Sequence, residues 1–194
     1  MPFLLRKPST QAIERKLAAL ESPFSYAEVG GTHDPDEATL ATAYRNLDGY
    51  EVRLGDGEAT FHRAKETIRT WRHFPAWVRI IYPYPSIEAN RPVAVVVRVL
   101  GLYSLNFTRI VYIIDEDRRF GFAYGTTAHH EEIGEERFLV EWREDGVWYT
   151  IFAFSSPQTF LAKLGYPVAR RMQRRFGRDS LAAMREGIRD DDQT

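Results

Sequence analysis

Cysteine is absent from this chain of 194 residues. Disulfides, thiolate nucleophiles and zinc–thiolate sites are therefore excluded. No apolar run approaches the ~20 residues that a membrane-spanning helix needs. The formal net charge is only −1, which gives no overall case for binding nucleic acid or an anionic membrane. The first residues, MPFLLRKPS, show no signal-peptide pattern, and we expect a cytoplasmic protein without stable membrane insertion.

The composition is that of a globular protein. Hydrophobic residues make up 44% of the chain and aromatic residues 13%, which is enough to form a core. The length fits a single domain. No internal repeat divides the chain, so residues 1–194 are predicted to form one barrel-like domain. The acidic end, residues 189–194, is predicted to be a frayed tail.

Most of the predicted secondary structure is β. Between Trp77 and Ser155, six segments rich in β-branched and aromatic residues follow one another, separated by turn residues. The short connections favour an antiparallel meander, since parallel strands need long crossovers. The segment FSYAEVGGT, ending at Gly30–Gly31, and the segment YEVRLGDG, with a hairpin signal at Asp56–Gly57, add N-terminal strands. The fold class is therefore mainly β (α+β), with about eight to ten strands in an antiparallel, barrel-like sheet.

Three helices flank the sheet in this prediction, near residues 9–20, 61–72 and 158–187. Ser9 suits the N-cap of the first helix, because its hydroxyl can accept a hydrogen bond from a free amide. One face of the second helix is apolar, which predicts packing on the sheet; it combines Phe61, Ala64, Ile68 and Trp71. Pro167 suits the first turn of the third helix.

Alternation along the strands identifies candidate interior polar residues, because side chains i, i+2 and i+4 share a face. Arg109, Tyr124 and Glu136 each fall on the more apolar face of their strand. A charge there needs a partner or an enclosed cavity. Two interpretations stay open, a polar cluster inside a small barrel or a structural Arg–Glu pair. If a cavity exists, the candidate substrate contacts on these faces are Phe107, Phe122, Thr126, Phe138 and Trp142.

The stretch GTTAHHEEIGEE, residues 125–136, holds two adjacent histidines and four glutamates. Adjacent strand residues point to opposite faces, so His129 and His130 cannot bind one ion together from a strand. The spacing matches no established metal site, and no dinucleotide, GxSxG or HExxH motif is present. We therefore expect neither a metal nor an organic cofactor. The stretch is either a solvated loop or places His130 at the mouth of a cavity, where an imidazole pKa of ~6.5 suits proton transfer.

Arginines dominate the last predicted helix. They recur at helical spacing and form one basic stripe: Arg170, Arg171, Arg174, Arg175 and Arg178. Such a stripe is either a solvated helix face or a surface that meets phosphate. With the overall charge near zero, no nucleic-acid partner is expected.

Four segments resemble the successive motifs of an uncharacterised domain-of-unknown-function family found in bacteria and plants. They are LGDGEATFHRAKETIRTW, GLYSLNFTRIVYIIDE, GFAYGTTAHHEEIGEERF and VWYTIFAFSSP. The resemblance runs from about Tyr26 to about Gln173, and its most specific elements are GFAYGT and GEE.F. The segment TAHHE departs from the family, which usually has a proline- and glycine-containing turn there. In size and strand content the chain is also similar to small β-barrel cyclases of polyketide pathways that form spiroacetals.

The resemblance to such cyclases implies an enzyme that forms a spiroacetal from a hydrophobic polyketide inside a barrel cavity, without a cofactor. Glu136 would donate or accept the proton, and Arg109 would set its charge state. Tyr124 and His130 would relay protons or orient hydroxyls. The alternatives are a carrier of a lipid-like small molecule and a structural module with a filled barrel. The expected partner of the enzyme or the carrier is a hydrophobic small molecule.

Overall fold

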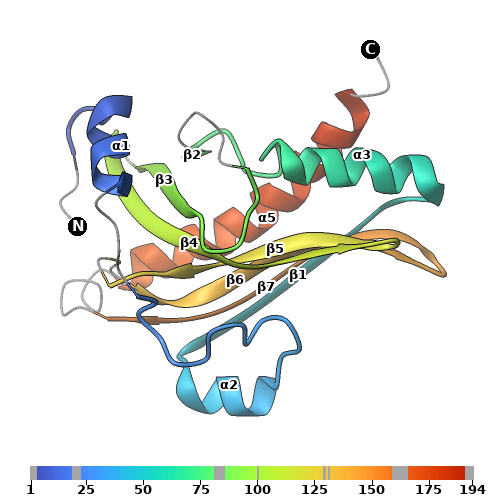
Figure 1. Ribbon diagram of the computed structural model, residues 1–194, viewed down its shortest axis with the longest axis horizontal. Helices are drawn as coiled ribbons and strands as arrows, with labels where there is room; N and C mark the ends of the chain where they lie inside the picture. Colours follow the sequence, from blue (N-terminus) through green and yellow to red (C-terminus); the bar gives the residue numbers. More distant parts are fainter. Residues whose placement is uncertain are drawn as a thin grey trace.

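The computed structural model describes residues 4–18, 23–80, 86–99, 101–128, 130, 132–158 and 166–190. Its helices are α1 (Thr10–Ala18), α2 (Glu37–Ala43), α3 (Gly57–Arg69) and α5 (Tyr166–Asp190). Its strands are β1 (Asn46–Gly55), β2 (Val78–Ile80), β3 (Pro92–Val99), β4 (Leu102–Glu116), β5 (Arg119–Thr126), β6 (Glu132–Arg143) and β7 (Gly146–Pro157). The strands form one sheet with helices on both of its faces (Figure 1).

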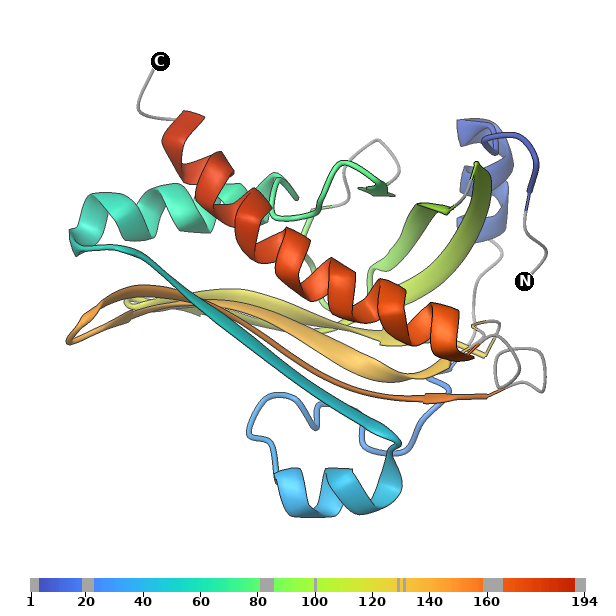
Figure 2. The same ribbon diagram turned by 180° about the vertical axis from the view of Figure 1, so that it is seen from behind.

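The sheet has seven strands in the described part of the chain, in the order β1-β7-β6-β5-β4-β3-β2. Every neighbouring pair is antiparallel. Strands β2 to β7 are neighbours in chain order, so the predicted meander of six strands is confirmed. The sheet is strongly curled (Figures 1 and 2). Because β1 and β2 are its two edges, it is a half-barrel rather than a closed barrel.

The strand predicted to end at Gly30–Gly31 does not form. After an isolated antiparallel bridge between Phe24 and Thr127, the chain continues in turns. The cause is a long-range contact, because the Glu135 side chain of β6 accepts hydrogen bonds from backbone N–H groups of this segment. The described sheet therefore has fewer strands than the predicted number.

The predicted hairpin at Asp56–Gly57 is wrong. Strand β1 ends at Gly55, and α3 begins at Gly57 with Asp56 as its N-cap residue. Gly55 and Gly57 have φ angles of 147° and 79°, which favour glycine because it lacks a Cβ atom. The two glycines turn the chain from a strand into a helix instead of into a second strand.

The helices divide between the two faces of the sheet. α3 and α5 cover the concave face, and α2 lies beyond the convex face (Figures 1 and 2). α1 packs on β3, and Ser9 caps it as predicted, since the Ser9 hydroxyl accepts a hydrogen bond from the Ala12 N–H. The main core lies between α3 and the sheet, where the whole predicted stripe is buried: Phe61, Ala64, Ile68 and Trp71.

α5 is the longest helix of the described chain, with 25 residues. It has Pro167 in its first turn, as predicted, and includes Arg189 and Asp190, which the sequence analysis assigns to a frayed tail. The remaining parts of these two predictions, residues 159–165 and 191–194, lie outside the described residues. No helix in the described part of the chain is long and apolar enough to cross a membrane.

The side of α5 that faces the sheet is polar near the start of the helix and apolar near its end. Tyr166, Arg170 and Gln173 bond to polar groups of the sheet. Met184 and Ile188, near the other end, belong to the main core. The two ends of one helix are therefore held by different kinds of interaction.

Two glycines let α5 approach its neighbours closely. A Cβ atom at Gly177 would lie 2.4 Å from the Tyr50 ring of β1. A Cβ atom at Gly187 would lie 2.6 Å from the side chain of Thr67 in α3. These distances are shorter than van der Waals contact, so any larger residue would push α5 outward.

Candidate active site

One row of the sheet carries an unusual set of residues on the concave face. Backbone pairing aligns the neighbours Asp48, Ala153, Glu136, Tyr124 and Ile110, from β1, β7, β6, β5 and β4. Residues directly opposite one another share a face of the sheet. Ile110 and Tyr124 pack with the main core, which places the row on the concave side. Ala153 is small, so no bulky side chain separates Asp48 from Glu136.

The side chain of Glu136 makes a single hydrogen bond within the described residues. The Tyr124 hydroxyl donates to Glu136 Oε2 over 2.7 Å. The Tyr124 ring is held in turn by neighbouring rings, with centroids 5.4 Å from Phe138 and 6.3 Å from Phe122. A carboxylate has sites for about four hydrogen bonds. Glu136 Oε1 is thus available to a ligand.

Burial raises the pKa of Glu136 to about 7, because removal from water disfavours the charged carboxylate. The hydrogen bond from Tyr124 lowers this pKa, whereas the negative charges of Asp48 and Glu132 raise it. Burial also raises the pKa of Tyr124 well above its usual value, so the phenol stays protonated and remains a donor. A carboxyl group that titrates near neutrality can both give and take a proton.

Tyr124 and Glu136 lie deep in the molecule but keep part of their surface accessible. Three other side chains that pack against the main core are also only partly buried: Phe176 of α5, Val97 of β3, and Trp77. These partly accessible side chains mark a candidate ligand region between the concave face and α5, which we call the hollow. Apolar walls with a few polar groups are typical of small-molecule sites.

The polar end of α5 is bound to the sheet near this hollow. Arg170 makes a bidentate ion pair with Asp48, with one of its two N–H···O distances at 2.8 Å. Gln173 Nε2 donates to Glu132 Oε2 over 2.7 Å, and burial raises the pKa of Glu132. α5 therefore supplies a partner to two of the three carboxyl groups, and Glu136 receives none from it in the described structure.

The structure brings together four of the residues predicted from strand alternation: Phe122, Tyr124, Glu136 and Phe138. Trp142 lies at the α3 end of the sheet, with its ring centroid 6.3 Å from that of Phe61. Thr126 is buried, and its hydroxyl bonds to Ser25 and to the Gly134 N–H. The bonding capacity of Thr126 is thus used by the fold.

Arg109 does not join the cluster, which corrects the expected convergence with Tyr124 and Glu136. It lies on the convex side, where its guanidinium is 5.7 Å from the centroid of the Phe24 ring. Phe107 points the same way and packs with Ile13 of α1. Alternation groups Phe107 and Arg109 on one face correctly, but the more apolar face of β4 in this region is the convex one, and the concave face carries Asn106, Thr108 and Ile110.

His130 does not provide the expected titrating group. Its Nδ1 atom accepts a hydrogen bond from the Glu132 N–H over 3.1 Å. Burial lowers the pKa of His130 to about 4, so the ring is neutral at physiological pH. Its neighbours His129 and Glu131 lie outside the described residues. Among those that are described, no three acidic or histidine side chains are arranged to hold a metal ion.

Glu135, which the sequence analysis treats only as part of the acidic turn, has a separate structural task. It points to the convex face and accepts hydrogen bonds from the Tyr26 hydroxyl at 2.7 Å, the Gly30 N–H at 2.8 Å and the Thr32 N–H at 3.0 Å. The Thr32 hydroxyl also donates to it. Gly125 makes room for this contact, because a Cβ atom there would lie 1.9 Å from the Tyr26 oxygen. Glu135 and Gly125, from the two specific motifs, thus hold a loop on the sheet.

His73 is a buried histidine that the sequence pattern does not reveal. It is fully buried, and neither ring nitrogen makes a hydrogen bond within the described residues. Aromatic rings surround it, with centroids 4.7 Å away in Phe74 and 5.0 Å away in Phe138. Burial lowers the pKa of His73 to about 3, and the nearby Thr67 backbone opposes this without reaching hydrogen-bond geometry. The imidazole is therefore a neutral part of the core.

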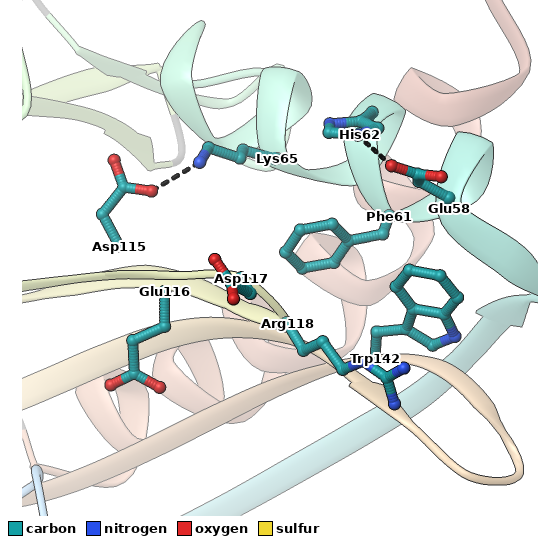
Figure 3. Close-up of a pocket in the computed structure, with 9 residues that line it drawn as sticks. All are labelled: Glu58, Phe61, His62, Lys65, Asp115, Glu116, Asp117, Arg118 and Trp142. Atoms are coloured by element: carbon teal, nitrogen blue, oxygen red, sulfur yellow. Dashed lines mark hydrogen bonds and ion pairs between the residues drawn. The ribbon is translucent and has the colours of Figure 1, made fainter.

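An open pocket of about 520 Å³ lies between α3 and the turn that joins β4 to β5 (Figure 3). Phe61 and Trp142 line it, and Lys65 bonds to Asp115 over 2.5 Å. The Arg118 guanidinium lies 4.9 Å from the centroid of the Trp142 ring. The acidic side chains that line this pocket are exposed, at 72% for Glu58 and 54% for Glu116, so the pocket lacks a buried carboxyl group like that of Glu136.

Sequence comparison finds a family profile that covers most of the chain. The profile of a domain of unknown function, DUF1990, matches residues 25–183. A UPF0548 protein of Dictyostelium discoideum is 33% identical over 206 residues, which cover 96% of this chain and 95% of that protein.

The fold also resembles solved structures of low sequence identity. The hypothetical protein jhp0584 from Helicobacter pylori is 12% identical and aligns with a TM-score of 0.52, over 84% of this chain and 94% of that one. The di-domain ARO/CYC BexL from the BE-7585A biosynthetic pathway is 14% identical and aligns with a TM-score of 0.49, over 92% of this chain and 60% of that one. The similarity to the Helicobacter pylori protein is one of fold.

Proposed function

This chain belongs to the DUF1990 family of domains of unknown function, and we propose that it is an acid/base enzyme that acts on a hydrophobic small molecule without a cofactor. The ligand would lie in the hollow between the concave face and α5. The observation that carries the proposal is the Tyr124–Glu136 pair. It combines a buried carboxyl group of pKa about 7 with an oxygen that no described residue binds.

The reaction we propose is the formation of a spiroacetal from a dihydroxyketone of polyketide type. One hydroxyl adds to the ketone and gives a hemiacetal. The Glu136 carboxyl protonates the hemiacetal hydroxyl, which leaves as water and gives an oxocarbenium ion. The second hydroxyl attacks the same carbon, and its proton returns to the Glu136 carboxylate. The net change is the loss of one water molecule, and no electrons are transferred.

The surroundings of Glu136 suit this chemistry. Tyr124 fixes one carboxyl oxygen and leaves the other for the ligand. Trp77 and Phe176 supply accessible apolar surface that excludes water, which otherwise competes for the oxocarbenium ion, and the buried rings of Phe122 and Phe138 support Tyr124 from behind. A carboxylate close to a developing positive charge stabilises it more strongly in such a site than in water.

The test is a substitution that removes only the titration. Glu136→Gln keeps the size of the side chain, and we expect conversion of a synthetic dihydroxyketone to fall by about 10²-fold or more. Mass spectrometry follows the conversion as the loss of water. Glu141→Gln is the matched control, because Glu141 lies on the same strand but pairs with Arg119 and Arg143. The control should keep the wild-type rate.

The pH profile separates the acid role from simple binding. If protonated Glu136 releases the water, the rate falls as the pH rises through about 7. Equal rates for the wild type and Glu136→Gln would overturn the proposal. Recovery of the ketone bound but unchanged by the wild type would instead identify a carrier.

A further inference from the structure

The outer face of α5 carries a row of arginines that the fold does not use. Five exposed arginines of this helix form no ion pair or hydrogen bond within the described residues: Arg171, Arg174, Arg178, Arg185 and Arg189. We name these five residues the arginine stripe. At 3.6 residues per turn they fall on one side of the helix and extend over about 27 Å.

Charge is separated in this molecule although its total is near zero. α5 contains seven arginines and three acidic residues, so its formal charge is +4. The whole chain carries −1, which leaves −5 for the remaining residues. Among the residues that the structure describes, two arginines of α5 have acidic partners, Arg170 with Asp48 and Arg175 with Asp179. The excess positive charge of the helix therefore lies in the arginine stripe.

The arginine stripe works against the stability of α5. Arg171 and Arg174 are three residues apart, and Arg174 and Arg178 are four apart. Like charges at these spacings repel each other along a helix. Folding alone gives no reason for such a row, whereas a partner that supplies negative charge would relieve the repulsion.

We propose that the arginine stripe docks the protein on an anionic lipid surface. Guanidinium groups bind phosphate oxygens in pairs of parallel hydrogen bonds. The stripe follows one straight helix whose outer side is not covered by another element in Figure 2, so it suits a flat surface. Val168, 57% exposed in the first turn of α5, adds an apolar group that can enter the headgroup region.

Nucleic acid also presents phosphates, and arginine can bind the edge of guanine, but α5 supplies no other side chains to read or stack on bases. The exposed residues of α5 include no asparagine, glutamine or aromatic residue. Side chains of these types recognise base edges or stack on bases. Docking on lipid goes beyond the proposed chemistry and does not require Glu136, although it would hold the hollow close to a source of hydrophobic ligands.

The experiment measures sedimentation of the whole protein with vesicles. We expect binding to mixed phosphatidylcholine and phosphatidylglycerol vesicles, no binding to phosphatidylcholine alone, and weaker binding in added salt. The triple variant Arg171→Gln/Arg174→Gln/Arg178→Gln should lower the partition into mixed vesicles by about 10²-fold. Its circular-dichroism spectrum should be unchanged, because the substitutions relieve repulsion.

A matched control removes the same charge elsewhere. Arg6→Gln/Arg79→Gln/Arg98→Gln changes three exposed arginines outside α5 and should bind like the wild type. If the triple stripe variant does not fold, Arg185→Gln/Arg189→Gln serves in its place, with an expected loss of about tenfold or more.

Three vesicle results would overturn the proposal: equal binding to both kinds of vesicle, no binding to the mixed vesicles, or wild-type binding by the stripe variants. The last measurement adds a short DNA duplex as a competitor of the mixed vesicles. If the duplex displaces the wild type from mixed vesicles and does not bind the stripe variant, the partner is nucleic acid and the lipid proposal fails.

Discussion

Glu135 and Glu136 are neighbours in the chain, but their carboxyl groups lie on opposite faces of the sheet. Glu135 receives hydrogen bonds from Tyr26, Gly30 and Thr32, whereas Glu136 receives one, from Tyr124. Glu135 is only 2% exposed, whereas Glu136 keeps part of its surface accessible. Glu136 also keeps unused bonding capacity, and an acid/base group must keep an oxygen free for its substrate.

The largest expected effect tests the structural role of Glu135. Glu135→Ala leaves the buried donors of Tyr26, Gly30 and Thr32 without an acceptor, and we expect a loss of about 3–5 kcal/mol in the free energy of unfolding. Urea denaturation measures it, with Glu136→Ala as the matched variant, which should lose much less. Similar losses for the two variants would show that the two carboxyl groups do not differ as described.

The next effect tests Glu136 through the pH dependence of protein stability. The pKa of Glu136 is raised in the folded protein, from the usual value of 4.5 to about 7, so the folded state holds a proton that the unfolded state has released. The stability that Glu136 contributes in its protonated form is fully present below pH 4.5 and is lost as the pH rises through 7. As the pH rises from 4.5 to 7, the free energy of unfolding of Glu136→Gln should therefore increase by up to about 3 kcal/mol relative to that of the wild type. A constant difference between the two urea-denaturation curves would contradict the raised pKa.

A smaller effect tests the space that the Glu135 contact requires. Gly125→Ala places a methyl group where the Tyr26 hydroxyl lies, and we expect a loss of about 2 kcal/mol in the free energy of unfolding. Gly49→Ala is the control, because a Cβ atom at Gly49 of β1 would meet nothing within 4 Å. Thermal unfolding compares the two. Equal melting temperatures would mean that Tyr26 moves aside without cost.

The smallest effect concerns His73, whose ring nitrogens make no hydrogen bond within the described residues. Its pKa in the folded protein is about 3, below the usual 6.5, so stability is lost as the pH falls through 6.5. His73→Phe keeps a ring of similar size and cannot be protonated. Between neutral pH and about pH 5.5 the wild type should lose about 1 kcal/mol more than the variant. Parallel losses would show that the acid sensitivity arises from other groups.

The Tyr124–Glu136 contact could be predicted from the sequence for a physical reason. Short turns force consecutive strands into antiparallel pairs, and strand alternation then decides which side chains share a face. Arg109 shows the limit of this argument. A register shift between Ile110 and Tyr112 interrupts the alternation of β4, and nothing local tells that the more apolar face before this shift is the convex one.

Long-range contacts were not predictable in the same way. Glu135 finds its donors in Tyr26, Gly30 and Thr32, more than 100 residues earlier in the chain. A run of glutamates gives no sign that one of them is buried on the convex face. The partners that α5 supplies to Asp48 and Glu132 were missed for the same reason, since they depend on how the helix crosses the sheet.

The different attachments of the two ends of α5 have a consequence for its dynamics. Salt weakens ion pairs such as Arg170–Asp48, whereas apolar contacts such as those of Met184 weaken on cooling. We therefore expect the two halves of the helix, on either side of Gly177, to behave as separate cooperative units in hydrogen exchange. The first half would then detach while the second stays docked. A sub-global opening of half a helix would set access to the hollow, while the rest of the molecule keeps its native structure.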